Sequence, residues 1–153
     1  MSCGKHYDTE NCVCDILREI ADAQDDVVSS DCHTSCEQSI NDLLGDTVAN
    51  NKDTVPVLLY CKGNCKPFEG FGAKKGAIND IMGSFYFRVK HVDKDCCATL
   101  ELLRDPNDND KDPDSPVKQF TGNLKRTGIC ISVDLDCFCH VTCLPAIDAT
   151  TMA

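Results

Sequence analysis

The stretch Cys130–Cys143, with the sequence CISVDLDCFCHVTC, gives the strongest indication of the fold. Apolar and polar side chains alternate along it and just before it. One parity holds Ile129, Ile131, Val133 and Leu135, and the other holds Cys130, Ser132, Asp134 and Asp136. A period of two is typical of a β-strand with one buried face. If the chain continues or turns once after Asp136, Cys137, Cys139 and Cys143 line one face of the sheet.

Outside this stretch the sequence predicts a helical beginning followed by more strands. Val13, Ile16, Leu17 and Ile20 are spaced three and four residues apart, which predicts an amphipathic helix over residues 12–28. A short second helix ends at Gly45. Beyond residue 54, alternating segments are separated by turns. We therefore predict a mainly β fold, an antiparallel β-sandwich or open barrel of about six or seven strands with an N-terminal α-helix.

The domain boundaries follow from the same pattern. Residues 11–145 form a single cysteine-rich domain, within which residues 54–145 are the β-domain. Residues 1–10 are polar and are expected to be a flexible N-terminal arm. Residues 146–153 are expected to be a C-terminal tail.

Two local features qualify this outline. Pro56 lies in the first predicted strand, which suggests an edge position, because proline has no N–H to donate to a neighbouring strand. Residues 105–116 are rich in Asp, Asn and Pro, so we expect an acidic loop that is solvated and does not pack. This loop begins like a calcium loop at Asp108, but Pro113 stands where an EF-hand needs glycine.

Charge and hydropathy exclude two classes of partner. The net charge of −10 argues against nucleic acid, whose phosphates bind Lys and Arg, and against anionic membranes. No stretch reaches the ~18 apolar residues of a membrane span. The first residues show no apolar core of a signal peptide, so we expect synthesis in the cytosol.

The thirteen cysteines are the main compositional signal. Their number is odd, so at least one thiol is free, metal-bound or bonded to another chain. The spacings are CxC, CxxxC and CC, with no CxxC, so the usual zinc knuckle and the thioredoxin-type motif are both absent. A cysteine-rich zinc-binding module stays open as the alternative, for example around Cys32, His33 and Cys36. We predict no catalytic residues and no cofactor, because no cysteine has a base and an orienting group in a recognisable pattern.

The position of each cysteine predicts its role. Cys3, Cys32, Cys36, Cys61 and Cys65 lie in polar or turn-like segments and are candidates for intermolecular disulfides. Cys97, Cys130, Cys137, Cys139 and Cys143 lie in predicted strands and are candidates for core or intrachain cysteines. Mobile, exposed thiols in an oxidising setting bond to other chains with little geometric restriction.

Three stretches resemble one family. ICISVDLDCFCHVTCL near the C-terminus, MSCGKH followed by NCVCD at the N-terminus, and FYFRV followed by CATL in the centre are similar to the spore coat Y/Z and exosporium Y family of Bacillus-type spore formers. The resemblance covers most of the chain. It implies a structural protein of the spore coat or exosporium, made in the mother-cell cytosol.

The resemblance also implies how such a protein would act. It implies symmetric oligomers, hexamers in particular, that tile into a two-dimensional lattice cross-linked by disulfides. The partners would be other copies of the chain and other proteins of the spore coat or exosporium. A cysteine-rich chain without a signal peptide fits a protein that is made inside a cell and oxidised after that cell lyses.

Overall fold

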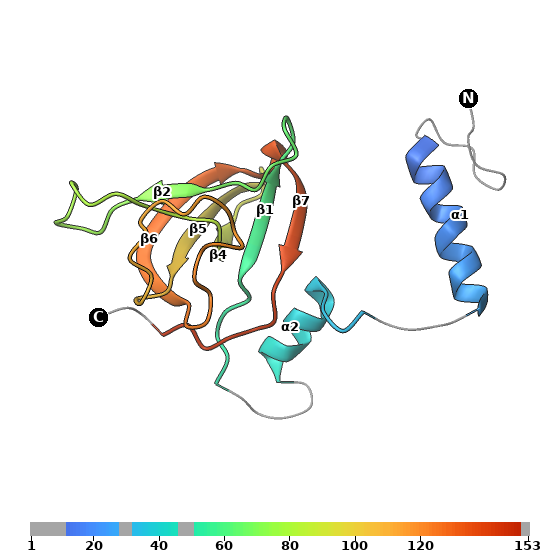
Figure 1. Cartoon of the computed structure of the whole chain (residues 1–153), viewed down its shortest axis with the longest axis horizontal. Helices are drawn as coiled ribbons and strands as arrows, with labels where there is room; N and C mark the ends of the chain where they lie inside the picture. The colour runs from blue at the N-terminus through green and yellow to red at the C-terminus, as the bar shows by residue number, and fades with distance from the viewer. Residues whose placement is uncertain (1–11, 28–31, 46–50, 151–153) are drawn as a thin grey trace. The chain divides into compact units, whose positions relative to one another are not determined.

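The computed structural model describes residues 12–27, 32–45 and 51–150. The chain divides into two compact units, Met1–His33 and Thr34–Ala153. The first contains helix α1 (Cys12–Val27), the expected N-terminal helix, whose exposed apolar side chains include Val13, Ile16, Leu17 and Ile20. The second unit contains helix α2 (Cys36–Leu44) and all the strands (Figure 1).

Helix α2 has clear signals at both ends. The side chain of Ser35 accepts a hydrogen bond from the N–H of Gln38 at 3.1 Å, as N-cap residues do. Gly45 ends the helix in the left-handed conformation at φ 69°, which costs glycine nothing because it has no β-carbon. The predicted short helix ending at Gly45 is therefore confirmed.

The described part of the chain contains seven strands, β1 (Val57–Cys61), β2 (Gly70–Gly72), β3 (Met82–Ser84), β4 (Phe87–Val92), β5 (Cys97–Arg104), β6 (Lys125–Asp134) and β7 (Phe138–Cys143). Five of them form an antiparallel sheet in the order β6-β5-β4-β1-β7, and β2 and β3 form a separate hairpin. The mainly β prediction is confirmed.

The sheet curls so that its two outer strands meet at one end. Strands β6 and β7 lie at opposite edges, yet only the 3₁₀-helix η1 (Leu135–Cys137) joins them. Three residues of 3₁₀-helix span about 6 Å, so the edges must be neighbours there. At the centre, β1 and β4 are paired only at Val57 and Phe87. The arrangement is that of a curled, open barrel (Figure 1).

The alternation from Ile129 to Leu135 is what the sequence predicts. Ile129 is buried, and Ile131, Val133 and Leu135 pack against the same apolar cluster, which includes the fully buried Phe87, Leu100 and Leu102. The opposite parity of β6, from Cys130 to Asp134, is exposed. Strand β2 lies close to β6, because a β-carbon at Gly72 would stand 2.4 Å from the side chain of Ile129.

Two local expectations are wrong. Strand β1 lies between β4 and β7, so it is not an edge strand. Pro56 is tolerated because it precedes the strand, where its carbonyl accepts a hydrogen bond from the N–H of Leu144 at 2.9 Å. The acidic loop does pack: Pro113 is fully buried, and the Arg104 guanidinium donates to the carbonyl oxygens of Asp108 and Asp110 at 3.3 and 2.7 Å.

Candidate functional site: a corner of surface thiols

The 3₁₀-helix η1 brings together the cysteines of three separate segments. The N–H of Leu135 donates to the carbonyl of Cys96 at 3.0 Å, at the β4–β5 turn. At the other end of η1, the carbonyl of Cys137 accepts from the N–H of Lys62 at 2.8 Å, in the turn after β1. The six cysteines of these segments are Cys61, Cys65, Cys96, Cys97, Cys137 and Cys139, and we call them the thiol corner.

The turn after β1 presents Cys65 to solvent. The N–H of Cys65 donates to the carbonyl of Cys61 at 3.0 Å, and the Asn64 side chain accepts from the N–H of Lys66 at 3.0 Å. These bonds hold Cys65 at φ 55°, in the left-handed region. Cys65 is exposed, and Lys62 and Lys66 beside it are exposed too.

The turn between β4 and β5 presents Cys96 in the same way. The Asp93 carboxylate accepts from the N–H groups of Asp95 and Cys97 at 2.9 and 3.0 Å, which fixes the turn. Cys96 lies at φ 62° and is exposed. The nearby Asp93 carboxylate raises the pKa of the Cys97 thiol, with smaller effects from burial and from Asp134 and Asp136. At a given pH, Cys97 therefore has less of the reactive thiolate than an ordinary cysteine.

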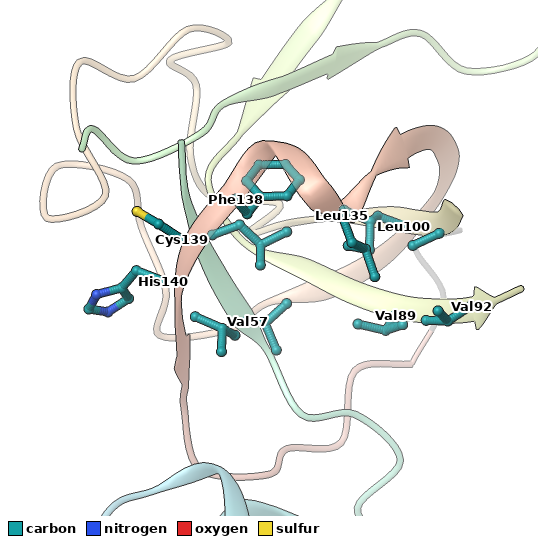
Figure 2. Close-up of a pocket in the computed structure, with 11 residues that line it drawn as sticks. Val57, Val89, Val92, Leu100, Leu135, Phe138, Cys139 and His140 are labelled. Carbon is teal, nitrogen blue, oxygen red and sulfur yellow. The ribbon is translucent and has the colours of Figure 1, made fainter. Parts of the chain in front are cut away.

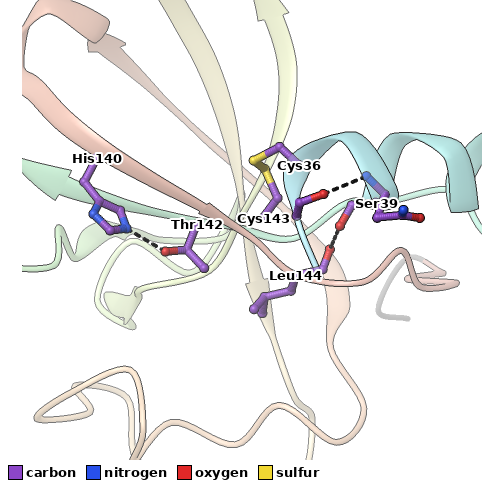
Figure 3. Close-up of a disulfide and its surroundings, with 8 residues drawn as sticks. Cys36, Ser39, His140, Thr142, Cys143 and Leu144 are labelled. Carbon is purple, nitrogen blue, oxygen red and sulfur yellow. Dashed lines mark hydrogen bonds between the residues drawn. A yellow bond between two sulfur atoms is a disulfide. The ribbon is translucent and has the colours of Figure 1, made fainter. Parts of the chain in front are cut away.

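Cys36 and Cys143 form a disulfide within the chain, with their Cα atoms 4.8 Å apart (Figure 3). The bond fixes α2 to β7. Ser39, buried in the same helix, donates its hydroxyl to the carbonyl of Leu144 at 2.7 Å. Cys36 was a candidate for a disulfide between chains. In the structure it is bonded to Cys143 of the same chain, because α2 packs on the end of β7.

The other predicted site residues lie at the surface. Cys3 lies outside the described residues. Among the residues that the structure describes, seven cysteines are exposed and carry free thiols: Cys32, Cys65, Cys96, Cys97, Cys130, Cys137 and Cys139. Cys61 is half-buried. No cysteine whose side chain is described is buried.

Of the cysteines predicted to be core or intrachain, Cys143 forms an intrachain disulfide, whereas the other four are exposed and so do not belong to the core. Cys97 and Cys130 lie on the polar parity of their strands, while Cys137 lies in η1 and Cys139 at an exposed position of β7. Sequence reasoning also missed Cys96. Its position directly after Asp93, Lys94 and Asp95, which read as a turn, was the signal that places it at the surface.

An apolar pocket of about 380 Å³ lies where β1 and β4 diverge (Figure 2). Its lining includes Val57, Leu100 and Leu135, and Cys139 and His140 lie at one side of it. The His140 ring packs at a tilt of 45° against the ring of Tyr60, with centroids 4.4 Å apart, and it hydrogen-bonds with Thr142 at 2.8 Å. The pocket therefore has few polar groups that could orient a substrate.

A search of the described residues for metal ligands gives no group of three or more His, Cys, Asp or Glu side chains placed to hold an ion. Among the same residues, no helix has the length and apolar character needed to cross a bilayer. The chemistry that the corner offers is thiol–disulfide exchange, which needs accessible sulfur atoms and no further catalytic group.

Fold and site together define a small, mainly β protein with an apolar core of aliphatic and aromatic side chains and with exposed thiols. The family model for spore coat protein Z matches residues 1–146, and the chain belongs to this family of spore coat proteins. Spore coat protein Z of Bacillus subtilis (strain 168) is 33% identical over 146 residues, which cover 89% of this chain and 90% of that protein. No solved structure matches the chain. The resemblance found in the sequence is confirmed, and so is the spore coat as the location.

Proposed function

We propose that this chain is a structural subunit of the spore coat that assembles with copies of itself and is then cross-linked by disulfides. The family supports a structural role in the coat. The self-assembly into symmetric oligomers, hexamers in particular, and the tiling into a two-dimensional lattice come from the resemblance to coat and exosporium proteins. Other coat proteins are its further partners.

One observation carries the cross-linking part of the proposal. The described cysteines lie outside the core, and seven of them are exposed with free thiols. A cysteine retained for packing behaves as a small hydrophobe and is among the most buried residue types. A cysteine at the surface can instead react with a thiol of another molecule. Several such cysteines on one subunit allow a cross-linked network of subunits and not only a dimer.

The order of events follows from the redox conditions. A cytosol keeps thiols reduced, so subunits made there must first associate through packing and hydrogen bonds. Disulfides form later, when the surroundings become oxidising. Each one then holds neighbouring subunits at high effective concentration and suppresses their dissociation.

The test is to produce the full chain with a strong reductant and to image it by electron microscopy before and after oxidation. We expect ordered oligomers or sheets in both states, with greater resistance to heat and detergent after oxidation. Unassembled monomer in the reduced sample would contradict the noncovalent first step. Metal analysis of the reduced protein is the control, because stoichiometric zinc would favour the cysteine-rich metal-binding module instead.

A further inference from the structure

The thiol corner carries two exposed cysteines whose backbone conformation is unusual. Cys65 and Cys96, at φ 55° and 62°, are the non-glycine residues with positive φ in the part of the chain that the structure describes. The left-handed region is unfavourable for a residue with a β-carbon, and Gly or Asn normally fills it. Two independent turns at one corner therefore have a cysteine where the backbone alone would favour another residue.

The two turns also carry opposite charge. The turn of Cys65 holds Lys62 and Lys66 and no acid. The turn of Cys96 holds Asp93 and Asp95 with one lysine between them. Asp134 and Asp136 lie close enough to act on the adjacent Cys97 thiol. A basic patch and an acidic patch, each with an exposed thiol, therefore lie at opposite ends of η1.

A surface with these two patches is complementary to itself. If two copies are related by a two-fold axis through the thiol corner, the basic turn of each copy faces the acidic turn of the other. We propose that two copies of this chain bond covalently here, with Cys65 of one copy joined to Cys96 of the other. This inference rests on the proposed function, because it assigns the cross-link to particular residues.

Three other cysteines of the corner are less suited to this bond. The carboxylate of Asp93 disfavours the thiolate of Cys97. Cys61 is half-buried, and the sulfur of Cys139 lies 3.6 Å from the carbonyl oxygen of Cys61. Cys65 and Cys96, in contrast, are exposed residues in the turns after β1 and before β5.

The bond forms by two exchange steps with a small-molecule disulfide such as oxidised glutathione. The thiolate of Cys65 attacks one sulfur of that disulfide and releases one thiol, which leaves a mixed disulfide on Cys65. The thiolate of Cys96 on the other copy then attacks the Cys65 sulfur and releases the second thiol. Two protein thiols are oxidised and one disulfide is reduced to two thiols, and the protons of the cysteines pass to the released thiolates.

Isotope mixing tests the bond and its connectivity. Equal amounts of unlabelled and ¹⁵N-labelled full chain are mixed under reductant, oxidised with glutathione disulfide, digested with trypsin without reduction and analysed by mass spectrometry. Cleavage after Lys62 and Lys94 releases peptides 63–74 and 95–104, which carry Cys65 and Cys96. The second peptide also carries Cys97, so the assignment is made in Cys97→Ser.

We expect the 63–74 peptide bonded to the 95–104 peptide, with mixed-isotope pairs in the proportion of random pairing. Cys65→Ser and Cys96→Ser each abolish these pairs, while Cys130→Ser, which removes an exposed thiol from the face of β6, keeps them. The double variant Lys62→Glu, Lys66→Glu slows their formation about tenfold at low salt, because the two faces then repel. Salt at about 1 M removes that difference.

If every cross-linked peptide pair carries a single isotope, the bond lies within one chain and the inference is overturned. Cross-links that use Cys130 and none of the cysteines of the thiol corner would overturn it as well. Electron microscopy of the reduced sample reports separately on assembly. Ordered arrays without the Cys65–Cys96 pair would leave the proposed function intact and refute this site.

Discussion

The buried carboxylate of Glu101 in β5 supports a quantitative prediction. Its side chain is 2% exposed. One oxygen accepts from Nε of Arg126 at 3.1 Å, and the other accepts from the N–H of Gly128 at 2.8 Å. Lys90 lies farther away, at 3.7 Å, and its own side chain is 34% exposed. Arg126, at 27% exposed, is the main compensating charge.

Replacing Arg126 with Met leaves this carboxylate buried with a single backbone donor and a distant ammonium. Removing one partner of a buried pair costs about 3–5 kcal/mol, and the remaining donor and the exposure of Arg126 bring the expected loss to about 2–3 kcal/mol. Lys90→Met is the matched control, expected to cost about 0.5 kcal/mol because an exposed ammonium at that distance contributes little. A loss of 2–3 kcal/mol lowers Tm by about 4–12 °C in a domain of this size.

Urea unfolding of the reduced, unassembled protein measures these differences as shifts in midpoint at constant slope. Adding Glu101→Gln to Arg126→Met should recover part of the loss, because the amide oxygen still accepts from Gly128 while the buried charge is gone. Equal effects of Arg126→Met and Lys90→Met, within about 0.5 kcal/mol, would refute the argument that burial of Glu101 sets the cost.

Three further predictions concern other parts of the domain. Ile131→Asp places an unpaired charge against the core and should prevent folding, while Ser132→Asp on the exposed face of the same strand should be tolerated. Soluble expression and circular dichroism compare the two variants. A folded Ile131→Asp variant would refute the strand assignment. Cys36→Ser should lower the free energy of unfolding by about 2–4 kcal/mol in oxidised protein and by little in reduced protein, because the disulfide to Cys143 closes a long loop. Urea unfolding measures both values. An equal loss in the two redox states would show that Cys36 contributes through packing and not through the disulfide. Burial, with a smaller contribution from a neighbouring carboxyl, raises the pKa of Glu69 to about 7, so its neutral form favours the fold and its stabilising effect is lost as pH rises from about 4.5 to 7. Glu69→Gln should match the wild type at pH 4 and exceed its stability at pH 8 by on the order of 1 kcal/mol, since partial exposure screens the effect; identical unfolding curves at both pH values would exclude this role of Glu69.

Local periodicity predicted the parts of the fold that local packing decides. The parity of Ile129 to Leu135 predicts which side chains of β6 face the core, because a strand presents alternate residues to each face. The same parity places Cys130 with Ser132 and Asp134 on the exposed face. Grouping Cys130 with the core or intrachain cysteines because it lies in a strand therefore overlooked which face of the strand it occupies.

Features that depend on distant segments could not be read in this way. The curl that joins β6 to β7 through η1 depends on how five strands pair, and it decides that the six cysteines of the thiol corner meet. The packing of the acidic loop depends on Arg104, which reaches from β5 to its backbone carbonyls. Composition reports that the loop is polar, but it does not show that a buried guanidinium organises it.

The disulfide between Cys36 and Cys143 also has a mechanical consequence. It joins residues 107 positions apart, and these residues would span about 360 Å if the intervening chain were pulled straight. Tension that enters before Cys36 and leaves after Cys143 passes through the sulfur atoms instead of through the β-sheet. The disulfide therefore fixes the distance between these two residues, and a pull applied to them leaves the β-sheet between them unloaded.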